Sequence, residues 1–178
     1  MKIVAIGGGF SYGPLGYSHH ATEDLAILRA IPDVTVVAPG CDWEVAAATD
    51  ALIETPGTCY FQLDKSSAGN TRRPGEEFRL GRGRAVSLHT GKPMDGEFVV
   101  ELARTHEALL VEEHSVIGGL GGAVAEVLMD AGVHPAGWKR LGLREGFSSI
   151  VGSQEYLRGR YGLDAEAVVA AAGELLRA

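Results

Sequence analysis

Two adjacent histidines carry the first candidate chemistry of this chain. The segment GYSHHATED places His19 and His20 between a predicted strand-and-loop region and a predicted helix. Ser18 is a favourable residue type for a helix N-cap, and Glu23 and Asp24 suit the positive end of the helix dipole. A histidine at a helix N-terminus tends to stay neutral, so it can exchange hydrogen bonds with a substrate oxygen. The alternative interpretation is a polar loop beside a helix cap.

A serine shortly before these histidines offers a second chemistry. The segment GFSYG, residues 9–13, matches the G-x-S-x-G pattern of hydrolases with a serine nucleophile. Ser11 would then attack the substrate, with His19 or a later histidine as its base. In those enzymes a helix follows at once, whereas here Pro14 and Gly16 favour an extended loop. A Ser11 hydrolase is therefore kept only as an alternative.

Two further motifs have structural interpretations that compete with functional ones. GGLGG, residues 118–122, lies between a predicted strand and a predicted helix, where phosphates can bind. Val124 stands where a dinucleotide fingerprint needs Gly or Ala, so tight packing of the turn is the prediction.

Glu112, Glu113 and His114 resemble metal ligands, but neighbours in a strand point to opposite faces and no fourth ligand is evident. We predict no metal site.

The elements expected to position these residues alternate between strand and helix. Apolar, β-branched runs predict buried strands at 2–6, 35–38 and 59–63 with helices between them, the pattern of a parallel sheet. Residues 64–84 are rich in Gly, Ser, Asn, Pro and charge and predict a linker or mobile loop. A second unit follows, with strands at 84–88, 108–112 and 138–141 and helices at 96–104, from 120, at 153–161 and at 165–177. The predicted fold class is α/β, with two three-layer units and mostly parallel sheets.

Composition narrows the classes of partner. With 178 residues, 46% of them hydrophobic, the chain can bury a core. A net charge of −7 disfavours nucleic acid and anionic membranes, which leaves small molecules or another protein. No apolar run approaches the span of a bilayer and no signal peptide is evident, so a cytoplasmic location is expected. Cys41 and Cys59 lack metal-site spacing and are expected to be reduced, structural thiols.

Three stretches resemble the transketolase family, thiamine diphosphate enzymes that move two-carbon ketol units between sugars. GFSYGPLGYSHHATEDLAILRAIPDVTVVAPG resembles the second half of the family's pyrimidine-binding domain. HTGKPMD resembles the H-T-I-K-P-L-D of its C-terminal domain, and LLVEEHSVIGGLGGAVAEVL with YGLDAEAVVAAA resembles the rest of that domain. The resemblance implies a partial pyrimidine-binding domain at 1–66, a linker at 67–83 and a shortened C-terminal domain at 84–178.

Parts of the family pattern have no counterpart in this chain. The glutamate that protonates the aminopyrimidine ring, and the domain that binds the diphosphate through magnesium, both belong to regions before the matched part. The resemblance therefore implies that thiamine diphosphate and Mg2+ are bound mainly by a larger partner subunit. Inside the chain, roughly a βαβ unit of the family's C-terminal domain is missing between Gly83 and Arg84.

The resemblance also assigns site residues. His19 falls on the histidine of the family's T-H-Q element, which lines the substrate channel, and is the expected catalytic residue. Lys65 falls where the family usually has an arginine that grips the acceptor's phosphate, and a lysine can act there as a point charge. Ser18 and His20 are grouped with Lys65 as substrate-binding, with His20 more a structural neighbour of His19. No residue is assigned to the cofactor or to a metal.

Two departures from the family affect the expected substrate. Gly7 stands where many members have a second phosphate-binding histidine, and Leu15 where they have an aspartate that contacts a substrate hydroxyl. The first hypothesis is the C-terminal subunit of a thiamine diphosphate-dependent transketolase-like enzyme, active only in a hetero-oligomer with a larger subunit and acting on an altered substrate. The alternative is a non-catalytic paralogue that regulates or scaffolds a transketolase-like protein.

Overall fold

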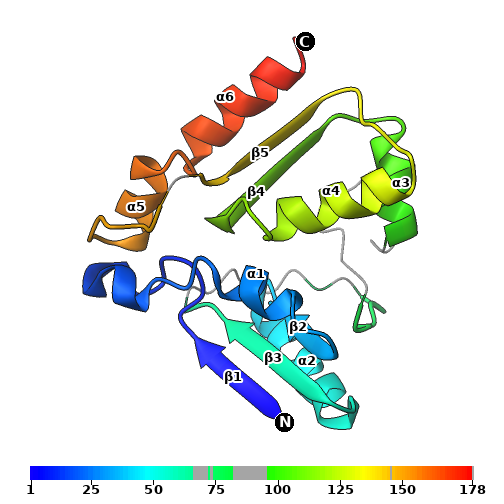
Figure 1. Cartoon of the computed structure of the whole chain (residues 1–178), viewed down its shortest axis with the longest axis vertical. Coiled ribbons are helices and arrows are strands. Elements are labelled where there is room, and N and C mark those ends of the chain that lie inside the picture. Colours follow the sequence, from blue (N-terminus) through cyan, green and yellow to red (C-terminus); the bar gives the residue numbers. More distant parts are fainter. Residues whose placement is uncertain (66–71, 73, 82–95, 145, 178) are drawn as a thin grey trace.

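The chain forms two α/β units, which lie one above the other in Figure 1 with helix α1 between them. The computed structural model describes residues 1–65, 72, 74–81, 96–144 and 146–177. Its strands are paired in parallel in both units. These features confirm the predicted α/β class.

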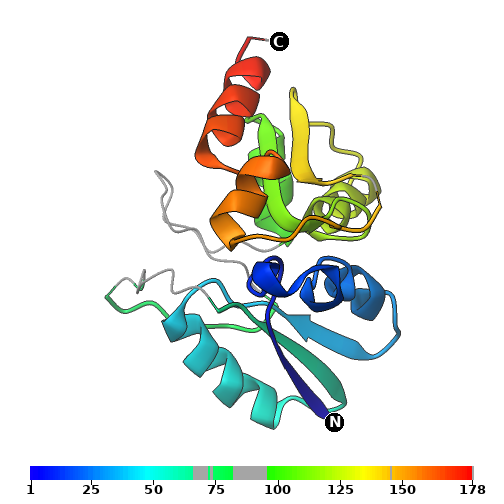
Figure 2. The ribbon, with the colours of Figure 1, turned by 90° about the vertical axis from the view of Figure 1, so that its left-hand side faces the viewer.

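The described residues of the first unit contain a sheet of three strands. Strands β1 (Lys2–Ile6), β3 (Thr58–Leu63) and β2 (Val34–Val37) lie side by side in that order. Helix α2 (Asp42–Glu54) covers one face, and helix α1 (Asp24–Arg29) lies toward the other, so the unit has three layers (Figure 2).

The core of this unit lies between α2 and the two strands β2 and β3. Its buried members are Ala48 and Leu52 of the helix and Cys59 and Phe61 of β3. Both cysteines are buried and neither is in a disulfide, as the sequence predicts. Phe78 and Leu80, from the predicted linker, pack against the same cluster. At least this part of residues 64–84 is therefore folded onto the first unit.

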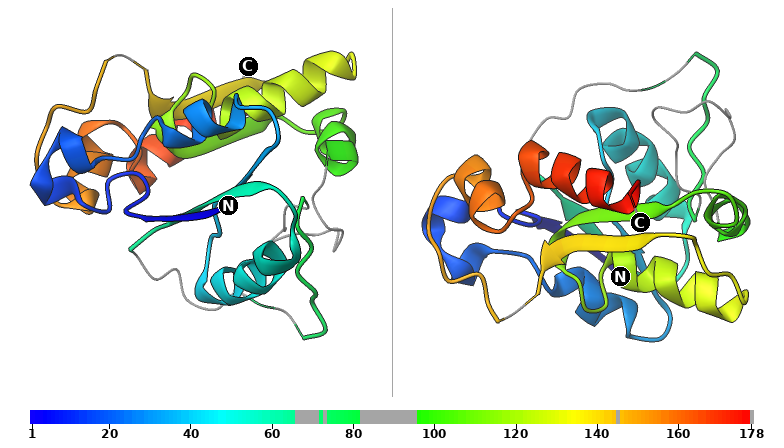
Figure 3. Two further views of the ribbon diagram at one scale, coloured as in Figure 1. Left: turned by 60° about the horizontal axis from the view of Figure 1, so that its bottom comes forward. Right: turned by 90° about the horizontal axis from the view of Figure 1, so that it is seen from above.

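Among the described residues, the second unit contains a sheet of two strands with helices on both faces. Strands β4 (Ala108–Ser115) and β5 (Trp138–Leu143) are parallel neighbours. Seen from above in Figure 3, the last helix and α4 lie on opposite sides of these strands. The helices of this unit are α3 (Gly96–Ala103), α4 (Leu120–Asp130), α5 (Gln154–Arg160) and α6 (Ala165–Leu175). Ser153 and Asp164 cap α5 and α6, since each side chain accepts a backbone N–H of the first turn.

The two units share a core around one aromatic ring. Phe10, from the loop after β1, has no exposed surface and packs among Leu143, Leu157 and Leu163 of the second unit. Its ring stacks on Tyr161, with centroids 5.3 Å apart. The loop that follows β1 therefore packs against the second unit as well as being bonded to its own sheet.

Two local predictions are wrong. Residues 2–6 form the predicted strand, but it is not buried: Val4 is 59% and Ile6 62% exposed, because β1 is an outer strand that α2 does not cover. The helix expected to begin after Ser18 begins only at Asp24. Residues Tyr17–His19 form a short 3-10 turn instead, entered through Gly16 at a φ of 82°.

Some predictions fall outside the described residues. The strand expected at 84–88 lies there, and so do the predicted domain boundaries at 66–67 and 83–84, which stay predictions. The remaining helices and strands form within a few residues of the predicted positions. No helix in the described ranges has the length and apolar character needed to cross a membrane.

Candidate functional site

The carboxyl ends of β1 and β3 bring two loops together. The N–H groups of Gly7 and Gly8 both donate to the carbonyl of Leu63, at 2.8 and 3.1 Å. The loop after β1 therefore lies directly beside Asp64 and Lys65, which follow β3. In open α/β sheets this edge is where ligands bind. We define residues 7–13 as the glycine loop.

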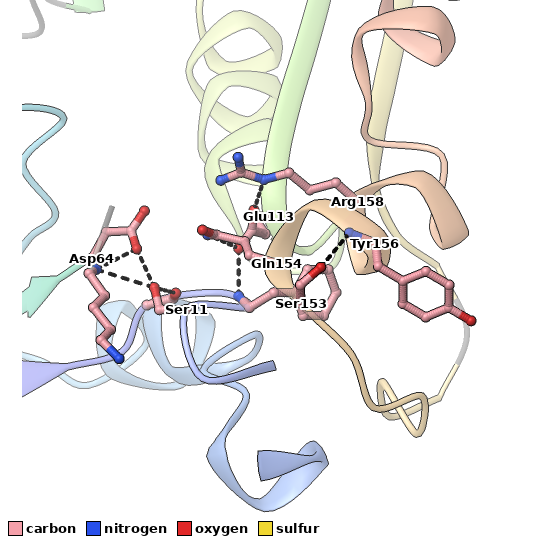
Figure 4. Close-up of polar contacts among 10 residues, drawn as sticks. Ser11, Asp64, Glu113, Ser153, Gln154, Tyr156 and Arg158 are labelled. Atoms are coloured by element: carbon pink, nitrogen blue, oxygen red, sulfur yellow. Dashed lines mark hydrogen bonds and ion pairs between the residues drawn. The ribbon is translucent and has the colours of Figure 1, made fainter. Parts of the chain in front are cut away.

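Ser11 of the glycine loop is bonded to its neighbours rather than to a base. Its hydroxyl lies 2.7 Å from the carbonyl oxygen of Gly8 and also contacts the Asp64 carboxylate (Figure 4). The Lys65 N–H donates to Ser11 Oγ at 3.3 Å. A 3-10 turn, Gly13–Leu15, follows the serine where a hydrolase would have a helix. These contacts leave Ser11 as a link between two loops, and the hydrolase arrangement is not formed.

Lys65 stands at the outer side of this edge. Its side chain is exposed, and Nζ lies 4.9 Å from the centroid of the Tyr12 ring. Such a cation–π contact orients an ammonium group without neutralising it. Lys65 is therefore able to meet an anionic group of a ligand at the carboxyl edge of the sheet.

His19 and Ser18 lie together in the 3-10 turn. Both are exposed, and Ser18 Oγ lies 3.1 Å from His19 Nδ1. Because α1 begins at Asp24 with Glu23 as its N-cap, His19 is not at a helix N-terminus. The argument that a helix N-terminus keeps the His19 imidazole neutral therefore does not apply. His19 is nevertheless exposed, so a ligand can reach it.

His20 differs from its neighbour. It is buried, with Nδ1 2.6 Å from Ser148 Oγ and Nε2 3.3 Å from the carbonyl oxygen of Gly13. Its ring also meets that of Phe10 edge to face at 5.3 Å. Both ring nitrogens are thus engaged within the protein, which makes His20 a contact between the two units. The substrate-binding role given to it stays a prediction.

A buried polar cluster beneath this edge was not expected from the sequence. Asp24 Oδ2 accepts hydrogen bonds from the Tyr60 hydroxyl at 2.5 Å and from Gln62 Nε2 at 2.6 Å. Burial, strengthened by the bond to Asp24, raises the pKa of the Tyr60 hydroxyl far above its usual value. On the facing strand β4, His114 Nε2 lies 3.9 Å from Asp24 Oδ1. Alternation along β4 places Glu112 on the same face as His114, which is the signal that could have predicted this cluster.

Three oxygen and nitrogen atoms of this cluster are unusual. Asp24 Oδ1, Glu112 Oε2 and His114 Nε2 are buried and have no hydrogen-bond partner in the described part of the chain. The other Glu112 oxygen accepts the N–H of Gly121 at 3.1 Å. Gly119 gives Glu112 room, because a Cβ there would overlap Oε2. The predicted packing role of the GGLGG turn is confirmed at this position.

Glu113 lies on the face of β4 opposite to Glu112 and His114, and its contacts were not predicted from the sequence either. Its Oε1 accepts the N–H of Phe10 at 2.5 Å and Gln154 Nε2 at 2.8 Å, and Oε2 is paired with Arg158 (Figure 4). No local pattern indicates these partners, because Phe10 and Arg158 are far from Glu113 in the chain.

The described residues do not fit a magnesium site. Nowhere among them do three or more His, Cys, Asp and Glu side chains gather in a way that could hold a metal ion. Glu112 and Glu113 point to opposite faces of β4, as the sequence predicts, so they do not converge.

Comparison with known proteins assigns the chain to a family. Residues 1–70 match the transketolase pyrimidine binding domain, and residues 83–168 match the transketolase C-terminal domain. The chain belongs to the transketolase family. The order of the two matches confirms the resemblance found in the sequence.

Relatives of this transketolase-family chain include subunits of divided enzymes. A protein of Methanocaldococcus jannaschii described as a transketolase C-terminal section is 29% identical, over 94% of this chain and 64% of that protein. An apulose-4-phosphate transketolase subunit of Actinobacillus succinogenes is 25% identical, over 95% of this chain and 66% of that protein. A split gene transketolase, solved as an inactive beta4 tetramer, is 30% identical with a TM-score of 0.78 over 99% of this chain and 66% of that chain.

The chain spans about two thirds of the length of these relatives. The match to the Methanocaldococcus protein extends over 205 positions, whereas this chain has 178 residues. That relative therefore carries residues within the matched region that this transketolase-family chain lacks. An internal gap was predicted between Gly83 and Arg84, a position outside the described residues.

Proposed function

We propose that this chain is the C-terminal subunit of a thiamine diphosphate-dependent transketolase-like enzyme that acts only together with a larger subunit. The observation that carries the proposal is the edge formed by the glycine loop and Lys65, where an exposed cation lies beside a glycine-rich loop at the carboxyl ends of parallel strands. Relatives named as a subunit of a transketolase and as a split gene transketolase support the division into two chains.

In the proposed enzyme the partner supplies thiamine diphosphate and Mg2+. The cofactor, when bound, provides the carbanion chemistry of two-carbon transfer. This chain's own contribution is orientation and proton movement: exposed His19 exchanges a proton with substrate oxygens, and Lys65 attracts an anionic group of the acceptor. Ser18 keeps His19 Nδ1 engaged, so the Nε2 side of the ring is the one that faces a ligand.

The exposure of β1 supports a partner chain. Strands of parallel sheets are normally covered on both faces, yet Ile3, Val4 and Ile6 are all at least 36% exposed. In the part of the chain that the structure describes, no strand pairs with the outer edge of β1. Such an apolar outer strand is a surface that another chain can cover. A larger subunit that packs against this strand would bring its cofactor site close to the glycine loop, which follows β1 directly.

The second candidate function is a non-catalytic paralogue that binds a transketolase-like protein. Glycine at position 7 and leucine at position 15, where the family has a histidine and an aspartate, favour it. Such a chain would form the complex without restoring ketol transfer.

Native mass spectrometry of the protein isolated from its own source tests the proposal. We expect a complex with a larger subunit that also carries the masses of thiamine diphosphate and magnesium. Transfer of a two-carbon unit from a ketose to an aldose is then assayed in that complex, with His19→Ala as the variant. A complex without transfer would favour the non-catalytic alternative, and a chain that travels alone would overturn both.

A further inference from the structure

The carboxylate of Glu113 crosses from the second unit into the glycine loop of the first. Its Oε1 accepts the N–H of Phe10 at 2.5 Å, although the two residues are 103 positions apart in the chain. A hydrogen bond to an ionised acceptor is stronger than a neutral one. This bond therefore fixes the backbone of the loop to strand β4.

The Glu113 carboxylate can approach the glycine loop because residue 9 has no side chain. Gly9 has a φ of 57°, a conformation that side chains disfavour, and a Cβ at this position would lie 2.5 Å from Glu113 Oε1. Gly9 also exchanges backbone hydrogen bonds with Ala21 at 2.9 and 3.1 Å. The glycine at position 9 is thus required for the carboxylate to reach the N–H that follows it.

Helix α5 holds Glu113 from the other side. Arg158 pairs with Oε2, and Gln154 donates to Oε1 at 2.8 Å, so both carboxylate oxygens are directed (Figure 4). The side chain of Glu113 is only 18% exposed, which limits competition from water. The carboxylate is consequently a fixed point on the second unit rather than a mobile surface group.

The residue after Phe10 connects the loop to Lys65 at the proposed substrate site. Ser11, the next residue, bonds to Asp64 and accepts the N–H of Lys65. We infer that Glu113 is a positioning residue, through which the second unit sets the place of the glycine loop and of Lys65 for the reaction. This inference rests on the proposed function and assigns the second unit a part in it.

The first test does not depend on catalysis. Amide exchange of Phe10 is followed by NMR in the full chain, as wild type, Glu113→Ala and Glu113→Gln. We expect exchange to be about tenfold faster or more in the alanine variant, as loss of a bond to a charged acceptor predicts, and to be intermediate in the glutamine variant. Glu126→Gln is the matched control, because it removes the carboxylate charge from another contact between the units, to Arg29, without touching the loop.

The second test uses the complex with the larger subunit. We expect Glu113→Ala to lower kcat/KM for the acceptor by about tenfold or more, with partial rescue in Glu113→Gln and no change in Glu126→Gln. A general loss of stability would instead lower activity in proportion to the folded fraction. If the alanine variant does not fold, the glutamine variant, of equal size, carries both tests.

The outcomes separate the inference from the proposed function. Unchanged Phe10 exchange, or altered exchange with unchanged acceptor kinetics, overturns the positioning role of Glu113. Absence of ketol transfer in the wild-type complex overturns the proposed function, and the inferred part in catalysis with it, while the exchange data still decide whether Glu113 fixes the loop.

Discussion

His114 Nε2 lies 3.9 Å from Asp24 Oδ1, and neither atom has a hydrogen-bond partner in the described part of the chain. His114 Nδ1 lies 2.9 Å from the carbonyl oxygen of Ser115, so in the neutral ring this nitrogen carries the hydrogen. Nε2 then presents a lone pair to a carboxylate oxygen. In this neutral tautomer two acceptors face each other at the contact between the units, where a buried polar atom without a partner is costly.

An amide at position 24 should relieve this arrangement. In Asp24→Asn the amide oxygen can keep the bonds from Tyr60 and Gln62, while the nitrogen donates to His114 Nε2. The substitution also removes the negative charge of Asp24, which the helix dipole favours at the start of α1, and this loss offsets part of the gain from the bond to His114. We therefore expect the unfolding free energy of Asp24→Asn to lie within about 1 kcal/mol of wild type. In Asp24→Ala both buried donors lose their acceptor, and a loss of about 2–4 kcal/mol is expected.

Urea unfolding of these variants decides the matter. Asp50→Ala, at an exposed position on α2, is the control and should change the unfolding free energy by no more than about 0.5 kcal/mol. If the asparagine variant is as unstable as the alanine variant, then the carboxylate itself is needed and the pairing of Asp24 with His114 is misinterpreted.

The adjacent histidines should separate stability from activity. His20→Ala removes a buried ring that bonds to Ser148, so we expect a loss of about 1–3 kcal/mol in unfolding free energy. His19 is exposed and its alanine variant should lie within about 0.5 kcal/mol of wild type. In the complex with the larger subunit, His19→Ala should lower turnover by about 10²-fold or more. Full turnover in the folded His19→Ala protein would remove this residue from the catalytic assignment.

The α/β class and the succession of elements could be predicted because they depend on local patterns. The β-branched run at β2 and the spaced apolar residues of α4 each specify their element without reference to the rest of the chain. The exposure of β1 could not be predicted in this way. Its sequence is that of a buried strand, and only the sheet order shows that Val4 and Ile6 lie beyond the cover of α2.

The site was predicted less completely than the fold. Ser18 has the residue type of an N-cap, but Gly16 and the 3-10 turn delay α1 to Asp24, because local preferences compete with the packing of Phe10 and His20 on the second unit. Phe10, which donates to Glu113, and Asp24, which faces His114, both come from the first unit, so no local pattern indicates these contacts. Alternation along β4 indicates only which of these side chains share a face.

The ion pair of Glu126 with Arg29 should make stability depend on acidity. The guanidinium of Arg29 holds the pKa of the Glu126 carboxyl below its usual value. A carboxyl whose pKa is lower in the folded state stabilises the fold above its unfolded pKa, and this contribution is lost as the pH falls through the folded pKa. The Tm of wild type should therefore exceed that of Glu126→Gln at neutral pH, and the two should converge in acid. Because the pair is exposed, the difference is expected to be small and to shrink in salt. A Tm difference that persists in strong acid would mean that the substitution acts through packing.

Gly119, the N-cap of α4, and Gly122, within the first turn of α4, should respond in opposite ways to alanine. In Gly119→Ala the new Cβ would lie 2.6 Å from the carbonyl oxygen of Ser115 and would overlap Glu112 Oε2, and backbone cannot yield easily. We expect a loss of at least about 2 kcal/mol, as for other overpacked sites. Gly122, two residues into α4, has no atom nearer than 3.8 Å to such a Cβ, so Gly122→Ala should gain about 0.5–1 kcal/mol from helix propensity. Both values are measured by urea unfolding. An unfolding free energy of Gly119→Ala no lower than that of wild type would show that the turn tolerates a side chain and that Glu112 is not confined by Gly119.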